Sequence, residues 1–201
     1  MASRKIGSRF NRLWYSLIFL FAYMLGIETY PWLNDTVFQG EPLHFQAHSD
    51  GVYFTRNGEK PDEAVLSLIQ ASKESIHLAI YALTEPRIVD ALIRAHARGV
   101  NVQIITDFKQ TQGDAQNKAI RLLIDKGIPV RVNSHQGLMH LKLLIVDQRE
   151  AAVGSFNYSK AASTINDEVV VLLSDPEAVQ HFEKTFASMW HNTKDYRPFY
   201  P

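Results

Sequence analysis

The sequence predicts an α/β fold in which a mixed, largely parallel sheet is flanked by helices on both faces. From residue 43 onward, short runs of Val, Ile and Leu alternate with segments whose apolar residues recur at helical spacing. The helical segments are 12 to 16 residues long. Strands that alternate with such helices form a sheet covered by helices. With 46% hydrophobic residues among 201, the chain can bury an ordinary core.

The expected elements follow one another along the chain. Strands are predicted at 42–58 (a strand or hairpin), 75–83, 100–107, 128–133, 140–147, 151–156 and 166–174, and helices at 60–73, 85–99, 114–127 and 175–190. Pro61, Pro86 and Pro176 occupy first-turn positions, Asp175 is a candidate cap, and Gly99 and Gly127 follow helix ends. No internal repeat divides this region.

The N-terminus has a different character. Residues 13–27 carry no charge and follow four basic residues, Arg4, Lys5, Arg9 and Arg12. We expect an N-terminal hydrophobic helix in a segment of residues 1–40, acting as an uncleaved signal anchor or a cleaved signal peptide plus linker. A buried helix of the domain is the third alternative. An anchor would place the domain, residues 41–201, outside the inner membrane in the periplasm; cleavage would leave it periplasmic or secreted.

Composition excludes several classes of function. The chain has no cysteine, which excludes disulfides, thiolate metal sites and cysteine nucleophiles. The formal net charge is zero, with +4 in the first 27 residues and therefore −4 in the remainder. A strongly basic nucleic-acid-binding protein has a different charge balance, so any contact with a polyanion needs a local patch.

The segment MHLKLLIVD places two ionisable residues at the start of an apolar strand. Side chains alternate along a strand, so His140 and Lys142 share a face, whereas Asp147 has the opposite parity. A solvated strand end is one explanation. An active site is the other, since a neighbouring cation keeps histidine neutral and nucleophilic and also attracts phosphate. We expect Asp147 to support a backbone turn or a cation at the far end of the strand.

The residues that follow extend this pattern toward phosphate chemistry. Gly154 permits a close backbone approach, Ser155 and Asn157 can donate hydrogen bonds to phosphate oxygens, and Glu168 can fix a histidine tautomer. The pattern H-x-K-x4-D-x6-G-S-x-N occurs by chance in a chain of this length with odds on the order of 10⁻⁶. The histidine spacing gives no metal-ligand set, and no metal or other cofactor is expected.

This pattern resembles the signature of the phospholipase D superfamily. Together with YALTEPRIVDALIRAHARGVNVQIITD and the closing HNTKDYRPFY, it is similar to the single-motif bacterial endonuclease branch, which also contains the mitochondrial cardiolipin hydrolase type. The resemblance covers about residues 45–200 and implies a phospholipase D-like fold. It also implies that His140 forms a phosphohistidine and that Lys142 and Asn157 hold the phosphate. Ser155 would assist, Glu168 would orient the histidine and Asp147 would support the site.

One histidine is insufficient for a two-step reaction, which needs a nucleophile on one side of phosphorus and an acid on the other. No second H-x-K follows at the remaining histidines, which are His44, His48, His77, His96, His135, His181 and His191. We therefore expect a homodimer whose two-fold axis passes between two copies of His140. His135 is expected to be a surface residue.

Three functions remain open from the sequence. The first is a metal-independent endonuclease acting on DNA or RNA, with single strands favoured and with contacts at Lys109, Arg131, Arg149 and Lys160. The second is phospholipase D-type hydrolysis of phospholipid headgroups, phosphatidylcholine or cardiolipin-like, near a membrane. The third is a membrane-tethered binding module that binds phosphates without turnover.

Overall fold

The computed structural model describes residues 49–200, which belong to one unit of the chain, residues 45–201. The predicted N-terminal helix, the boundary near residue 40 and the first part of the predicted hairpin lie outside the described residues. Within them, no helix is both long and apolar enough to cross a membrane.

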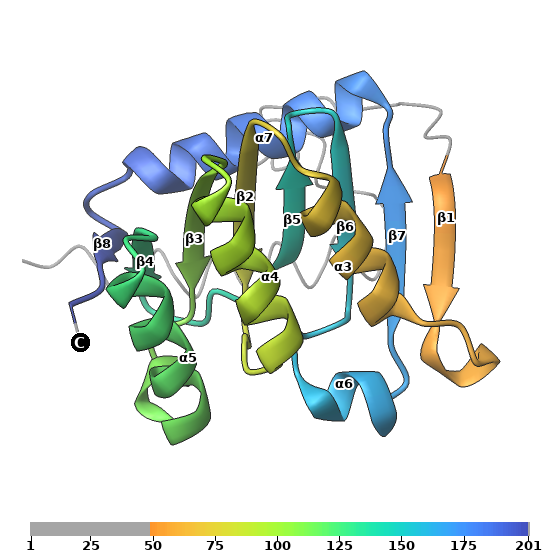
Figure 1. Ribbon diagram of the computed structural model, residues 1–201. Coiled ribbons are helices and arrows are strands. Elements are labelled where there is room, and N and C mark those ends of the chain that lie inside the picture. Colours follow the sequence, from red (N-terminus) through yellow and green to blue (C-terminus); the bar gives the residue numbers. More distant parts are fainter. Residues whose placement is uncertain (1–48, 201) are drawn as a thin grey trace, which may run out of the picture. The chain divides into compact units, whose positions relative to one another are not determined.

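Among residues 49–200, eight strands form one sheet, accompanied by five α-helices and two short 3₁₀ helices. Figure 1 shows their arrangement. The strands are β1 (Ser49–Phe54), β2 (Ser75–Ile80), β3 (Asn101–Thr106), β4 (Val130–Asn133), β5 (Lys142–Val146), β6 (Glu150–Gly154), β7 (Val169–Leu173) and β8 (Tyr196–Pro198). The helices are η1 (Thr55–Asn57), α3 (Pro61–Ala71), α4 (Pro86–Ala97), η2 (Gln110–Gln112), α5 (Asp114–Asp125), α6 (Lys160–Thr164) and α7 (Pro176–His191).

The sheet is mixed, as predicted, but it is not largely parallel. Its order is β1-β7-β6-β5-β2-β3-β4-β8, and in the part of the chain that the structure describes only the β2–β3 and β3–β4 strand pairs are parallel. The other five pairs are antiparallel. Parallel neighbours need a long crossover, which α4 and α5 supply, whereas residues 147–149 allow only a tight turn between β5 and β6.

Helices cover both faces of the sheet, as predicted. Helices α3, α4 and α5 lie on one face and α7 crosses the strands on the other (Figure 1). The larger apolar cluster lies under α3, α4 and α5, and a smaller cluster, which includes Ala79, Ile105 and Phe186, lies under α7. Strand β2 is buried along its whole length, because side chains on both of its faces meet helices.

The helix signals in the sequence are confirmed. Pro61, Pro86 and Pro176 begin α3, α4 and α7, and the Asp175 carboxylate accepts a hydrogen bond from the amide of Ala178 at 2.8 Å. Helix α6 and the short edge strand β8 were not predicted, because each is too short for a periodic pattern.

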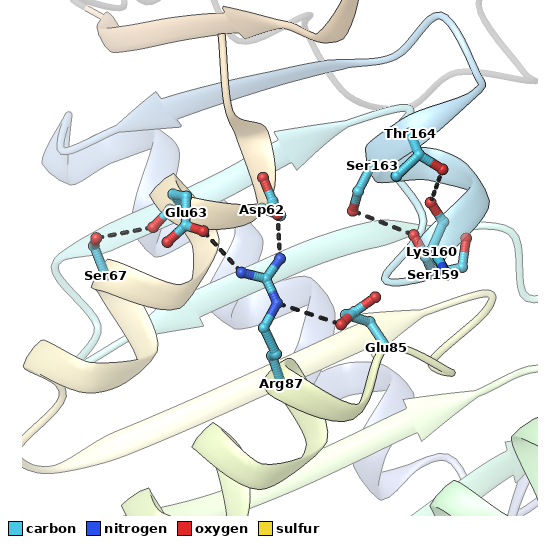
Figure 2. A network of polar contacts seen from close by, with 9 residues as sticks. All are labelled: Asp62, Glu63, Ser67, Glu85, Arg87, Ser159, Lys160, Ser163 and Thr164. Atoms are coloured by element: carbon cyan, nitrogen blue, oxygen red, sulfur yellow. Dashed lines mark hydrogen bonds and ion pairs between the residues drawn. The ribbon is translucent and has the colours of Figure 1, made fainter.

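A charged cluster joins the first turns of α3 and α4 (Figure 2). The guanidinium of Arg87 donates to Glu63 at 2.8 Å, to Asp62, and to Glu85 at 3.4 Å. The side-chain hydrogen bonds from Glu63 and Asp62 raise the pKa of Arg87 further above its ordinary value. This cluster fixes the segment that leaves β2, because Glu85 also donates its backbone amide to the carbonyl of Tyr158 at 2.9 Å.

Candidate active site

The structure brings His140 and Lys142 together at one edge of the sheet, meaning here the line formed by the ends of the strands and not an edge strand. Lys142 is the first residue of β5 and only 9% exposed, whereas His140 lies two residues earlier in an exposed loop rather than on the predicted strand. The Lys142 ammonium lies 3.1 Å from Nδ1 and 3.2 Å from Nε2 of His140, and it donates to the His140 carbonyl at 3.0 Å. The imidazole is thus exposed beside a fixed cation.

The surroundings of Lys142 alter its acidity. Burial lowers the pKa of Lys142 below the ordinary lysine value, and the negative charge of Glu168 opposes this shift. Desolvation strengthens the attraction between the ammonium and an incoming anion, and the carboxylate keeps the ammonium protonated. Lys142 is therefore suited to hold a phosphate oxygen.

Tyr81 packs against both members of this pair, and the sequence did not single it out. Its ring centroid lies 4.5 Å from that of His140 at an interplanar angle of 54°, and the Lys142 ammonium lies 5.0 Å from the Tyr81 centroid. Gln110 donates to the Tyr81 hydroxyl at 2.8 Å. The only sequence signal is that Tyr81 directly follows β2, whose last residue, Ile80, is paired with Lys142.

Ser155 and Glu168 reach the same edge from the next two strands. Ser155 directly follows β6 and Glu168 directly precedes β7, and these strands are antiparallel neighbours. The Ser155 hydroxyl donates to one oxygen of Glu168, and Asn166 donates to the other at 3.0 Å. Among the hydrogen bonds of the described residues, none joins Glu168 to His140, so the predicted role of Glu168 in orienting the histidine stays a prediction.

Gly154 permits the close approach that the sequence suggested. A Cβ atom at this position would lie 2.0 Å from the backbone oxygen of Val169. Any side chain would push β6 away from β7 and separate Ser155 from Glu168.

Asn157 lies on the segment between β6 and α6. This segment is fixed to the end of β2, because Tyr158 donates its amide to the carbonyl of Ala82 at 3.0 Å and accepts from the amide of Thr84 at 2.8 Å. The Oδ1 atom of Asn157 is buried and has no hydrogen-bond partner among the described residues. Buried polar atoms are normally paired, so this oxygen is available to a hydrogen-bond donor of a ligand, whereas the Nδ2 group of the same amide is the one that can donate to a phosphate oxygen.

Asp147 lies at the opposite end of β5, as its parity in the sequence suggested. Its carboxylate accepts hydrogen bonds from the backbone amides of Glu74 at 2.7 Å, Ser75 at 2.9 Å and Lys73 at 3.0 Å. At the rise of an extended strand, Asp147 is roughly 17 Å from Lys142. Its contacts therefore support the backbone before β2 and do not reach the reacting groups.

A buried network of hydrogen bonds fixes the loops that form the site, and the sequence did not predict this network. Gln116 accepts from the amide of Leu83 at 2.7 Å and donates to the Thr106 hydroxyl at 2.8 Å. Asp107, fully buried, accepts from the amide of Met139 at 2.9 Å. These bonds fix the loops that carry Tyr81 and His140.

The cations predicted to contact a substrate do not share one location. Arg149 lies at the Asp147 end of β5, 3.8 Å from Glu74, and Arg131 donates to the Tyr196 carbonyl with its guanidinium 5.6 Å from the Trp190 centroid. Lys160 begins α6, and Lys109 follows β3. Only Lys109 and Lys160 thus lie on segments that leave the edge of the sheet bearing His140. Within residues 49–200, no three or more His, Asp or Glu side chains are arranged to hold a metal ion.

Comparison with known proteins gives a consistent family. Residues 65–190 match the family described as "Cardiolipin synthase, PLD-like domain". The mitochondrial cardiolipin hydrolase of Homo sapiens is 33% identical over 134 residues, which are 67% of this chain and 52% of that protein. Phospholipase D of Rickettsia conorii is 31% identical over 132 residues, covering 65% of this chain and 62% of that protein. The chain thus spans little more than half the length of the curated relatives it matches.

Solved structures share the fold over nearly their full length. Nuc from Salmonella typhimurium, described as a phospholipase D family member, has a TM-score of 0.69 and 33% identity, covering 75% of this chain and 97% of that chain. NucT from Helicobacter pylori has a TM-score of 0.63 and 25% identity, covering 70% of this chain and 94% of that chain.

Proposed function

This chain belongs to the phospholipase D superfamily, and from that premise we propose that it is a phosphodiesterase in which His140 is the nucleophile. The observation that supports this proposal is an exposed imidazole held beside a desolvated lysine, with Ser155, Asn157 and Glu168 at the same edge of the sheet. Phosphoryl transfer is catalysed mainly by positioning and by charge stabilisation, which these groups supply.

The reaction has two displacement steps. A ring nitrogen of His140 attacks phosphorus, the bond to the leaving oxygen breaks, and that oxygen takes a proton from a second acid, giving a phosphohistidine and an alcohol. Water then attacks phosphorus, the acid of the first step accepts a proton from it as a base, and His140 is released. Lys142 and the Asn157 amide hold the non-bridging oxygens in both steps.

The second acid is His140 of a second copy of the chain. An isologous dimer places the same residue on both sides of its axis, so one site receives two imidazoles. Leu138 and Leu141 flank His140 and remain 44% and 41% exposed. Apolar side chains this exposed around a charged site suit burial against a partner.

We propose a nucleic acid, with single strands favoured, as the substrate. The supporting observations are the similarity to Nuc and NucT over nearly all of their length and the presence of Lys109 near the edge that bears His140. The alternative is phospholipid headgroup hydrolysis. The names of the curated relatives favour this alternative, and a membrane anchor in residues 1–40 would place the site near lipid, with an inner-membrane, periplasmic location.

A single set of assays separates these functions. The purified chain is incubated in excess chelator with single-stranded DNA, duplex DNA, RNA and labelled phospholipid. We expect cleavage of nucleic acid, whereas headgroup release alone would favour the lipid alternative and no turnover would favour a binding module. His140→Ala should remove all turnover, and acid-labile phosphate trapped on His140 would test the covalent step directly.

Dimerisation is tested by mixing the wild-type chain with an excess of His140→Ala chain. The mixed dimer has one His140 in the shared site and lacks the second acid, so turnover per wild-type chain should fall as the His140→Ala chain is added. Sedimentation should give a dimer for the wild-type chain. An active monomer would contradict the shared site.

A further inference from the structure

We propose that a pocket lined by Lys109 and Arg197 is a second phosphate subsite that holds a single-stranded polynucleotide at a fixed spacing from His140. This inference rests on the proposed phosphodiesterase function and specifies its substrate. The pocket has a volume of about 210 Å³ and lies where β3 and β4 end, with Phe108, Asn133 and Gly137 also in its wall. This volume suits a phosphate with part of its sugar.

The pocket is lined by positively charged side chains and, in the part of the chain that the structure describes, by no carboxylate. Among the described residues that line it, none is acidic, and neither Lys109 nor Arg197 forms an ion pair within residues 49–200. The Arg197 guanidinium lies 4.8 Å from the Phe108 ring centroid, which orients the group while leaving its edge free to donate. Two other pockets contain carboxylates, Asp167 and Glu168 in one and Glu183 in the other.

The carboxylate beneath the pocket does not compete for these cations. Asp107 is fully buried, and it accepts hydrogen bonds from the amides of Gln110 at 3.1 Å and Met139 at 2.9 Å. His135 lines the pocket as well, but its Nδ1 lies 2.7 Å from the carbonyl of Gln136. A neutral ring that uses its single N–H there has none to offer a phosphate.

The register of the sheet gives the distance between the two sites. β2, β3 and β4 are parallel, and β5 is antiparallel to β2, so the carboxyl ends of β3 and β4 share an edge with the start of β5. Neighbouring strands are about 4.8 Å apart, so this pocket, two to three strands from β5, is roughly 10–15 Å from Lys142. The loop of residues 134–141 joins the two sites.

The distance between the two sites favours a substrate that has several phosphates along one backbone. Stacked nucleotides advance about 3.4 Å each, so a single strand bridges the two sites with roughly three to four nucleotides. A phospholipid with one phosphate cannot occupy both sites. Two phosphates joined through one glycerol are separated by too few bonds to do so.

The test is the length dependence of cleavage. Wild-type chain is compared with the double variant Lys109→Gln and Arg197→Gln on single-stranded oligonucleotides of two to ten nucleotides and on bis(p-nitrophenyl) phosphate, which has one phosphate. The matched control is Lys118→Gln with Lys126→Gln, two exposed cations of α5 and its C-terminus, which removes the same charge. The quantity measured is kcat/KM for each oligonucleotide divided by that for the small diester.

We expect this ratio to rise about tenfold in the wild-type chain once the oligonucleotide exceeds about four nucleotides, and to stay flat in the double variant. An equal loss in the control variant would overturn the subsite, because the effect would then be that of net charge. A rise that persists in the double variant would also overturn it. If the wild-type chain cleaves the small diester and a lipid but no oligonucleotide, the proposed nuclease function itself fails, which is a different outcome from a flat ratio.

Discussion

Asp147 is predicted to stabilise the fold without taking part in the chemistry, and the variant Asp147→Ala separates these roles. The carboxylate accepts backbone hydrogen bonds at 2.7 and 3.0 Å from Glu74 and Lys73, which precede β2, and at 2.9 Å from Ser75, its first residue. Bonds to a charged acceptor contribute about 1.5–3 kcal/mol when buried, and partial exposure reduces this to about 1 kcal/mol each. The variant should therefore lose about 3 kcal/mol of unfolding free energy, or about 6–12 °C in Tm for a chain of this size.

The pH dependence of stability provides an independent measure of the same interaction. Burial alone would raise the pKa of Asp147, but the amides of Ser75, Glu74 and Lys73, together with Arg149, outweigh burial and lower it below 3.8. A carboxylate whose folded-state pKa is depressed stabilises the fold above its unfolded pKa, and this stabilisation disappears as the pH falls through the folded value. Asp147→Asn should thus lose stability at pH 7 and show a shallower loss of stability as the pH falls below about 4, the ordinary aspartate pKa.

The assay combines urea unfolding followed by circular dichroism with turnover of bis(p-nitrophenyl) phosphate below the transition. The exposed Asp125→Ala is the control and should be near neutral. The expected result is a large stability loss with kcat/KM within about threefold of wild type at a temperature where the variant is folded. A hundredfold loss of kcat/KM with unchanged unfolding free energy would refute the assignment and make Asp147 a member of the reacting group.

Three further predictions concern the site and the turn beside it. Burial lowers the pKa of Lys142 and Glu168 opposes this shift, so kcat/KM should fall as the pH rises through a value below the ordinary 10.5. This fall should occur at a lower pH in Glu168→Gln and at a higher pH in Lys142→Arg. An unchanged fall at alkaline pH in both variants would contradict a role for the Lys142 charge. Gly154→Ala should cost about 2–4 kcal/mol and most of the activity, because the new Cβ meets the Val169 oxygen at 2.0 Å, whereas Gly113→Ala, whose Cβ meets nothing closer than 3.5 Å, should cost little. Gln148→Gly should raise the unfolding free energy by about 0.5–1 kcal/mol. The reason is that Asp147 and Gln148 both have positive φ (52° and 55°) in the β5–β6 turn, a conformation that glycine adopts without strain. A decrease in the unfolding free energy would show that the Gln148 side chain stabilises the turn.

Local signals in the sequence predicted most of the fold. The prolines that begin α3, α4 and α7 act within one helical turn, so no distant contact is needed to interpret them. The proximity of His140 and Lys142 is equally local. The direction of strand pairing is not local, because it depends on the length of each connection and on which neighbour completes the sheet. The expectation of a largely parallel sheet failed for this reason.

The missed site residues are those that strand pairing brings in. Tyr81 lies some 60 residues before His140 in the sequence and meets it only because β2 pairs with β5 in one register. Asp107 and Gln116 are polar residues at the ends of ordinary elements, and nothing in their neighbours distinguishes them from surface residues. Their burial and hydrogen bonds distinguish them, and both follow from the tertiary fold.

The direction of each strand explains why one edge of the sheet gathers the chemistry. The starts of β5 and β7 and the ends of β2, β3, β4 and β6 all lie at this edge, so His140, Glu168, Tyr81, Lys109, Asn133 and Ser155 project from six strands toward one side. The last residue of the pattern H-x-K-x4-D, Asp147, lies at the opposite edge, and its spacing from Lys142 equals the length of β5. The pattern therefore joins two independent requirements across one strand, a reacting pair at one end and a backbone anchor at the other. Lengthening β5 by two residues would keep both parities, and it should cost stability through the lost contacts of Asp147 before it alters the distance between His140 and Lys142.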